Sequence, residues 1–505
     1  MKASPTLATR PPPTVRLAWL QRLGPARTTT LLLVTLAALQ LTLAGRLGLV
    51  TDEAHYALYG LHLDWSYFDH PPLVGWLQAL VLVVSSSELA LRLWAMVLGA
   101  LSGALLYLLV RRLFPDESPW TACAAVALWC TAPDVHVTGM AVIPEDVLLP
   151  TALLVMHTLV SVLRRGSPLQ WLFLGAALGL AGLAKYTAVS LVVTVAGALL
   201  LAHRARDLRG PGPWMAVAAA ALLVAPVLLW NASHDWISFR YQLHHGTAGR
   251  HWEATDFLIS RAGELLAFGP ALVIGGLAAA QDGFLRERAE PGVRLLLLLA
   301  VPVLVLFWPT SGYEATLPHW TQLAWVALAV LAARFYLRGW DRAARRRLAL
   351  AGGAWCGLAL LAVHLVLGLR AGPADPVGRA RAPFTGWDRA AATAVRLRDE
   401  LAARPGSPPV LFTDHWTSAS RLAWYARPAQ VQVLDQRRTQ FDLWFGEPAR
   451  DARGILVAWG SPGPKDADED LARFERTRLL LEQPVEEPGG RIATFRFWEC
   501  DGYRP

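Results

Sequence analysis

The chain has 505 residues, of which 54% are hydrophobic and only 17% charged. Soluble proteins average about 45–50% apolar and about 25% charged residues, so this composition excludes an ordinary soluble protein and predicts a helical, polytopic membrane protein. The formal net charge of +8 would suit a nucleic-acid-binding protein. The arginines, however, stand in short clusters between apolar runs, as in cytoplasmic loops of membrane proteins, so we expect no nucleic-acid partner.

Residues 1–28 are basic and contain several prolines, and we expect them to form a cytoplasmic tail. A membrane domain then covers residues 29–370, with about eleven predicted transmembrane helices. They span about 29–48, 88–110, 120–137, 147–163, 169–184, 188–202, 214–230, 265–280, 295–309, 320–336 and 348–369. The apolar segment 73–84 is too short to cross, and we expect it to lie at the membrane interface or to re-enter.

The connections between these spans alternate in charge. If the N-terminus is cytoplasmic, every second connection carries arginines on the cytoplasmic side, as the positive-inside rule requires. The other connections then bring acids, histidines and a few basic residues to one extracytoplasmic face. These residues are Asp52, Glu53, Asp69, His70, Glu145, Asp146, Lys185, Arg240, His244, His245, Arg250, Glu314 and His319.

Residues 371–505 regain charge and contain no run long enough to span. The pattern predicts a helix over 387–401 and strands over 410–413, 431–434, 454–459 and 492–498, separated by Gly, Pro and Asp turns. An odd number of spans places this segment outside. We therefore expect a small extracytoplasmic α/β domain. The four cysteines do not form a disulfide framework or a metal cluster.

Carboxylates at the edge of an apolar span are costly, and membrane proteins usually keep them there for function. A carboxylate can orient or deprotonate an acceptor hydroxyl, and Lys and Arg can hold a phosphate while charge develops on it. Structural alternatives stay open. The pairs Asp52–Glu53 and Glu145–Asp146 can cap the helices that follow them, Lys185 can snorkel at a helix end, and His244–His245 can be solvated.

Short motifs follow one another in a fixed order along the chain. They are Asp-Glu at 52–53, Tyr-Phe-Asp-His-Pro-Pro at 67–72, Ile-Pro-Glu-Asp at 143–146, Gly-Leu-Ala-Lys-Tyr at 182–186, Phe-Arg-Tyr-Gln-Leu-His-His-Gly at 239–246, Leu-Pro-His-Trp at 317–320 and Phe-Asp-Leu-Trp at 441–444. The set resembles the bacterial family-39-type glycosyltransferases of the GT-C class, which include the protein O-mannosyltransferases and the aminoarabinose lipid A transferase.

The resemblance implies an integral membrane glycosyltransferase of the inner (cell) membrane. It would transfer a sugar, with inversion, from a polyprenyl-phosphate-linked donor to an extracytoplasmic acceptor, which can be a lipid, a glycan or a protein. Asp52 takes the place of the catalytic base, with Glu53 beside it. The other implied roles are donor-phosphate binding by Lys185, Arg240 and His70, substrate binding by Tyr56, Glu145, Asp146 and His244, and a possible divalent metal site at Asp69 and His245 or His244.

In two places the chain departs from the family. Its predicted number of spans is lower, so the distal domain can differ from that of the lipid A transferase. The lipid A transferase has Glu-Lys where this chain has Asp69-His70, which leaves the metal and one phosphate contact open. Two other functions remain possible. One is a polyprenyl-phosphate or lipid transporter (a flippase), although the chain lacks the internal repeat typical of transporters. The other is a catalytically silent relative that scaffolds an envelope complex.

Overall fold

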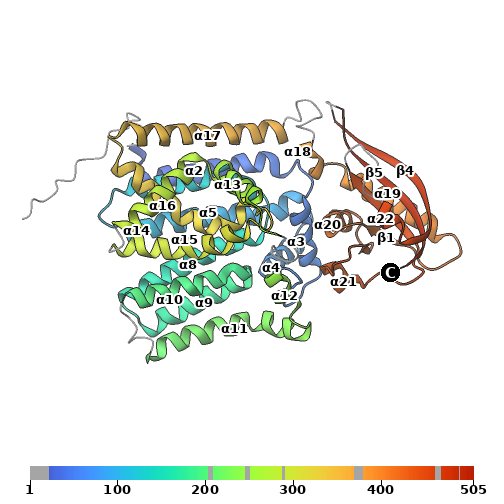
Figure 1. Cartoon of the computed structure of the whole chain (residues 1–505), viewed down its shortest axis with the longest axis horizontal. Coiled ribbons are helices and arrows are strands. Elements are labelled where there is room, and N and C mark those ends of the chain that lie inside the picture. The colour runs from blue at the N-terminus through green and yellow to red at the C-terminus, as the bar shows by residue number, and fades with distance from the viewer. Residues whose placement is uncertain are drawn as a thin grey trace, which may run out of the picture.

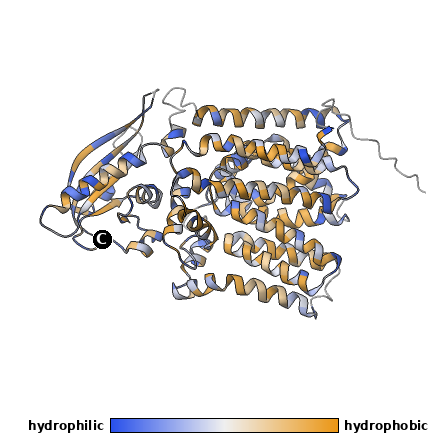
Figure 2. Cartoon of the chain, turned by 180° about the vertical axis from the view of Figure 1, so that it is seen from behind, coloured by the Kyte–Doolittle hydropathy of each residue, from blue (hydrophilic) through white to orange (hydrophobic). Residues whose placement is uncertain are grey.

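The structure is a computed structural model that describes residues 22–202, 209–244, 251–286, 290–368, 379–460, 468–487 and 490–504. A bundle of roughly parallel and antiparallel helices ends with α17, and the rest of the chain forms a sheet-containing unit at one end of the bundle (Figure 1). Hydrophobic residues dominate the bundle helices, whereas hydrophilic residues gather at the bundle ends and on the C-terminal unit (Figure 2). The protein is therefore a multi-pass membrane protein, as its composition predicts.

Within the described ranges, seven helices are long and apolar enough to cross a membrane. They are α2 (Pro25–Ala44), α5 (Glu88–Leu113), α8 (Pro144–Arg164), α11 (Pro211–Ser233), α15 (Pro291–Thr310), α16 (Gln322–Arg338) with the turn η3 (Pro318–Thr321) before it, and α17 (Ala343–Gly368). The pair α13 (Ala254–Phe268) and α14 (Pro270–Leu285), bent by 109°, would make an eighth.

Each of the eleven predicted spans coincides with a helix, but length supports seven or eight crossings. Three predicted spans are shorter helices, namely α6 (Pro119–Cys130), α9 (Pro168–Ala184) and α10 (Val189–Leu201). The predicted span 120–137 is divided at Pro133, whereas the predicted span 169–184 agrees with α9. Pro133 starts a separate short helix, α7 (Pro133–Thr138), and the backbone becomes extended at Lys185, between α9 and the turn η1 (Tyr186–Ala188).

Charge separates the two ends of the bundle. Helix α8 begins next to Glu145 and ends at Arg164, which donates a hydrogen bond to the carbonyl of Arg112 at the end of α5 (2.8 Å). At the same end, Arg338 pairs with Glu117 (2.7 Å). The opposite end meets the C-terminal unit through three short helices, α3 (Thr51–Leu61), α4 (Leu73–Leu82) and α12 (Ile237–His244) (Figure 1). The arginine ends and the acidic ends thus lie on opposite sides of the bundle.

The C-terminal unit is built on a five-stranded sheet of order β2-β1-β3-β5-β4. Strand β1 (Val410–Thr413) runs parallel to β2 (Val431–Val433) and β3 (Gly454–Gly460), and β5 (Gly490–Tyr503) runs antiparallel to β3 and β4 (Phe474–Glu487). The helical segments of this unit are α18 (Arg379–Arg381), η5 (Ala382–Phe384), α19 (Trp387–Ala402), α20 (Trp416–Tyr425), α21 (Gln440–Phe445) and α22 (Asp468–Leu471). The small α/β domain predicted from the sequence is therefore present. All four cysteines are buried and free.

Candidate active site

Helix α3 presents its first two acids to different neighbours. Consecutive helical residues point about 100° apart, so Asp52 and Glu53 cannot share one environment. Glu53 accepts a hydrogen bond from the Val50 backbone N–H (3.1 Å), which caps the helix. It also accepts two hydrogen bonds from the Arg92 guanidinium of α5, at 2.6 and 2.7 Å. Glu53 is thus held by a helix cap and a two-pronged ion pair, away from the Asp52 side of α3.

Arg92 extends this link to the end of α2. Its guanidinium also donates to the carbonyls of Ala44, Leu47 and Gly48, at 2.6, 2.7 and 2.9 Å. Both partners of the ion pair are buried, with side-chain exposures of 3% for Arg92 and 5% for Glu53. Removing one partner of a buried pair leaves a charge without compensation. The Arg92–Glu53 pair therefore fixes the start of α3, and with it the position of Asp52.

We expect Arg92→Met to destabilise the fold by about 3–5 kcal/mol, because Glu53 would stay buried without its partner. The double variant Arg92→Met/Glu53→Gln is expected to recover much of this loss, because it removes the unpaired charge. Thermal unfolding of the purified protein in detergent measures both. A Glu53→Gln variant that unfolds like wild type but loses turnover would contradict this assignment and make Glu53 a catalytic residue.

Asp52 faces a group of titratable side chains from its own helix and from three other segments. Among the residues that the structure describes, its carboxylate accepts no hydrogen bond. The charges that act on it come from His319, His55, Glu145 and Asp69. Burial of the carboxyl group raises the pKa of Asp52, while the two histidines act in the opposite direction. A carboxylate without a fixed partner and with a raised pKa suits a general base.

Lys185, Glu145 and His319 form a second charged group beside Asp52. The Lys185 ammonium donates to Glu145 Oε1, and His319 Nε2 lies 3.8 Å from the same oxygen. Side-chain exposures are 10% for Lys185 and 8% for Glu145. The extended backbone at Lys185 ends α9 and turns its side chain toward the start of α8. All three residues line a narrow cavity next to Trp320 and Gln322.

Asp69 lies at the centre of an aromatic cluster. It accepts a hydrogen bond from the Tyr59 hydroxyl, and its other oxygen lies 3.7 Å from His55 Nε2. Although burial by itself would raise the pKa of Asp69, the hydrogen bond and charge of His55 hold it well below its usual value. His55 in turn bonds Ser420 Oγ of α20 at 3.0 Å. This chain of contacts connects the first outer loop to the C-terminal domain.

His70 is half-buried, and its buried Nδ1 has no hydrogen-bond partner within the described part of the chain. Burial, with Lys185 nearby, lowers the pKa of His70 to about 4, and Asp69 and Glu145 only partly oppose this shift. The imidazole is therefore neutral near pH 7. As a neutral ring it can donate or accept one hydrogen bond to a bound group.

The described residues do not fit a metal site at Asp69. Its two oxygens face Tyr59 and His55, and no group of three His, Cys, Asp or Glu side chains suited to a metal occurs within the described ranges. His245, the other predicted ligand, lies outside the described residues, as does Arg250.

The structure brings together only part of the predicted site. Asp52, Tyr56, Asp69, His70, Glu145 and Lys185 converge, and Tyr56 packs its ring on His70 (5.6 Å between ring centroids). Asp146 faces away from them, because it caps α8 through the Ile143 N–H (3.1 Å) and lines a different pocket. Arg240 and His244 have exposed side chains on α12.

Two residues of the site, His55 and Arg92, were not named from the sequence, and His319 was named there only as a residue of the outer face and of a motif. His319 follows a proline before a late span, and His55 follows Asp52 by one helical turn, so their positions next to acidic motifs were the available signals. Arg92 stands alone in an apolar run, and a lone charge in a membrane span usually has a buried partner. The C-terminal domain contacts the first outer loop of the site, where Gln440 accepts a hydrogen bond from the Phe68 N–H (2.7 Å).

Comparison with known proteins gives a match to a family model, matches to several solved structures and a curated relative. The family model described as dolichyl-phosphate-mannose-protein mannosyltransferase matches residues 69–230. A crystal structure of ArnT from Cupriavidus metallidurans bound to undecaprenyl phosphate superposes with a TM-score of 0.59 at 16% identity, covering 92% of this chain and 97% of that chain. Arabinofuranosyltransferase AftD from mycobacteria gives 0.54 at 15% identity, covering 95% of this chain and 40% of that one.

Lipid A galacturonosyltransferase RgtD of Rhizobium johnstonii is 27% identical over 311 residues, which is 60% of this chain. The aligned region spans 63% of that relative's length. The structural matches establish the fold of the chain over nearly its whole length.

Proposed function

This chain has the fold of the GT-C glycosyltransferases, and from that premise we propose that it is an integral membrane glycosyltransferase that uses a polyprenyl-phosphate-linked sugar. The observation that carries the proposal is the convergence of Asp52, which has no fixed partner among the described residues, with the Lys185–Glu145–His319 group. A carboxylate and a cation suited, respectively, to accepting a proton and to holding a phosphate lie together at the end of the bundle that the C-terminal domain covers.

The reaction needs one bond to form and one to break. The acceptor oxygen attacks the anomeric carbon from the side opposite the phosphate, the carbon–oxygen bond to the phosphate breaks with its electron pair, and the configuration inverts. Asp52 takes the proton of the acceptor hydroxyl or orients that hydroxyl. The Lys185 ammonium stabilises the negative charge that grows on the departing polyprenyl phosphate.

Glu145 gives Lys185 a counter-ion before the donor binds. Glu145 also contacts His319. A phosphate that binds Lys185 therefore does not leave the Glu145 carboxylate without a partner. Asp69 holds His55, and Tyr59 holds Asp69, so these residues position the loop rather than react. Tyr56 and His70 form the wall that faces the sugar.

The orientation follows from charge. We place the arginine-rich ends of the helices in the cytoplasm and the site with its C-terminal domain outside, in the inner membrane of a bacterial cell, because Lys and Arg are enriched in cytoplasmic loops. ArnT was solved with undecaprenyl phosphate, which supports a donor of that lipid class. The acceptor is a lipid, glycan or protein on the same face.

A sugar-transfer assay with radiolabelled polyprenyl-phosphate sugars tests the proposal. It uses membranes from cells that express the protein, with membranes from vector-only cells as the control. We expect label to move from the donor into a lipid, glycan or protein fraction only when the protein is present. Protein-dependent movement of labelled polyprenyl phosphate across vesicles, without transfer from any donor, would favour the flippase instead.

A further inference from the structure

Helix α13 carries a buried acid that the proposed reaction does not use. Glu264 is 3% exposed, and both of its carboxylate oxygens accept hydrogen bonds. Oε1 accepts from the Thr321 hydroxyl at 2.6 Å, and Oε2 accepts from the Trp308 indole N–H at 3.1 Å. The Arg261 guanidinium lies 3.4 Å from Oε2 and supplies the opposite charge. A buried carboxylate with a partner for each oxygen holds the groups around it in one arrangement.

This network is attached to the turn that carries His319. Thr321, which donates to Glu264, is the last residue of η3 and follows His319 by two positions. On the other side of His319, the Thr316 backbone N–H donates to Ser260 Oγ of α13 at 2.9 Å. Helix α13 therefore holds the chain both before and after His319.

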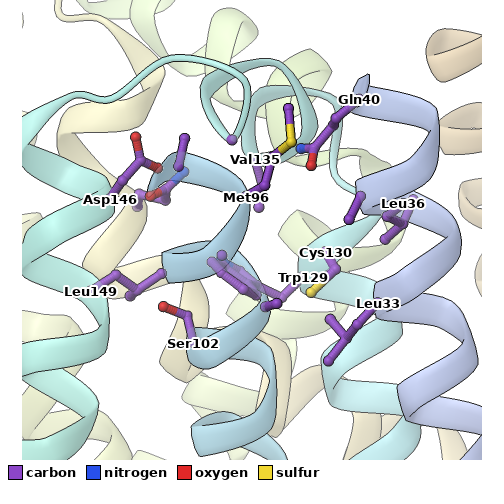
Figure 3. Close-up of a pocket in the computed structure, with 16 residues that line it drawn as sticks. Leu33, Leu36, Gln40, Met96, Ser102, Trp129, Cys130, Val135, Asp146 and Leu149 are labelled. Atoms are coloured by element: carbon purple, nitrogen blue, oxygen red, sulfur yellow. The ribbon is translucent and has the colours of Figure 1, made fainter. Parts of the chain in front are cut away.

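Cavities adjoin η3 and the start of α16. His319, Trp320 and Gln322 line the narrow cavity of the candidate active site. Gln322 also lines a second cavity, between α2, α5, α6 and α8, whose polar side chains include Asp146 and Ser102 (Figure 3). This second cavity has a volume of about 40 Å³, which is room for a few waters. Packing around η3 is thus incomplete, so its hydrogen bonds to α13 carry more of the task of fixing it.

The position of His319 affects both groups of the proposed chemistry. Its Nε2 lies 3.8 Å from Glu145 Oε1, the oxygen that also accepts the hydrogen bond of the Lys185 ammonium. It also acts electrostatically on Asp52. The titratable and charged groups around Asp52 are His55, Asp69, Glu145, His319 and, on α20 of the C-terminal domain, Arg421. A shift of His319 would therefore disturb the phosphate-binding cation and the base together.

We propose that Glu264 is a positioning residue of the transfer reaction, which holds η3 through Thr321 and so keeps His319 against Glu145 and beside Asp52. This inference rests on the proposed function. It adds α13, a helix that contains none of the sequence motifs, to the segments on which the site depends. Glu264 acts at one remove from the chemistry, through the Thr321 hydroxyl and the short turn that links it to His319.

Thr321→Val removes the hydroxyl that Glu264 holds and keeps the size of the side chain. The buried pair of Glu264 and Arg261 remains, so the variant is expected to fold. Thr321→Ser keeps the hydroxyl and is expected to restore wild-type behaviour. Thr310→Val on α15 is the matched control, because the Thr310 hydroxyl bonds backbone carbonyls of its own helix rather than a group that holds η3.

We expect Thr321→Val to lower kcat by about 10- to 100-fold, a loss typical of a misplaced active-site group, and Thr321→Ser and Thr310→Val to stay close to wild type. Because His319 acts to lower the pKa of Asp52, displacing His319 raises that pKa. The acidic limb of turnover therefore moves to higher pH in Thr321→Val alone. A lower unfolding temperature with the limb unmoved would make the hydroxyl purely structural and overturn the proposal.

Modification by diethyl pyrocarbonate gives a second readout that needs no catalysis. Mass spectrometry follows the rate at which His319 is modified, its side chain being 16% exposed. We expect this rate to rise several-fold in Thr321→Val and to stay unchanged in Thr321→Ser and Thr310→Val. An unchanged rate in Thr321→Val would show that Glu264 does not hold His319. If wild type transferred no sugar but showed this pattern of protection, the proposed function would fail while the hold of α13 on His319 stood.

Discussion

Asp52→Asn is expected to reduce sugar transfer by about 10²- to 10⁴-fold, the usual contribution of a positioned general base. The amide keeps the size of the side chain but cannot take the proton of the acceptor hydroxyl. Because burial raises the pKa of Asp52, ionising this carboxylate costs folding free energy at neutral pH. The variant should therefore unfold at the same or a higher temperature than wild type while it loses activity.

The pH profile checks the same residue. The base acts when deprotonated, so turnover should fall as pH decreases through the pKa of Asp52. Since that pKa is raised, the acidic limb should lie at higher pH than an ordinary aspartate would give. The limb should vanish from the residual activity of Asp52→Asn. An unchanged limb in the variant would assign the pH dependence to another group.

Lys185→Met is expected to lower kcat by about 10²- to 10³-fold, the cost of removing one group that stabilises developing negative charge. It should also destabilise the protein by about 3–5 kcal/mol, because Glu145 would remain buried with only His319 beside it. Sugar transfer and thermal unfolding in detergent measure the two effects.

The double variant Lys185→Met/Glu145→Gln separates these effects. It removes both members of the ion pair, so most of the lost stability should return, but no cation returns to meet the phosphate. Stability without activity is the expected result. If the double variant regained turnover, Lys185 would be a structural partner of Glu145 and another residue would bind the phosphate.

Apolar run length predicted the long helices of the bundle, because burial in lipid leaves little choice but a helix, but not the more polar helices α3, α12 and α13. By length and composition, seven or eight of the described helices are able to cross, and three predicted spans coincide with shorter helices, one of which ends before Pro133. The sequence prediction also missed strand β4. Its sequence is rich in charge, contains Pro484 and has mostly exposed side chains, which suits the edge of a sheet but hides the alternation by which strands are found.

The candidate site, like the fold, was predicted from the sequence only in part. Motif order indicated which segments meet, and the structure brings Asp52, Asp69, His70, Glu145 and Lys185 together. Helix rotation was not available from the sequence. The rotation of each helix points Glu53 toward Arg92 and Asp146 into a separate pocket, although Glu53 follows Asp52 and Asp146 follows Glu145 in the sequence. The partners of a buried charge depend on helices that lie far apart in the chain, so neighbouring motif residues need not share one role.

A reconstitution experiment tests the proposed sugar transfer most directly. It compares purified wild-type and Asp52→Asn protein in vesicles with a labelled undecaprenyl-phosphate sugar and membrane lipid from the host. We expect wild type to release free undecaprenyl phosphate and glycosylated acceptor in equal amounts, and the variant to form at most about 1% as much of both. Equal product from the two proteins, or loss of donor without a glycosylated product, would contradict a base-assisted transfer at this site.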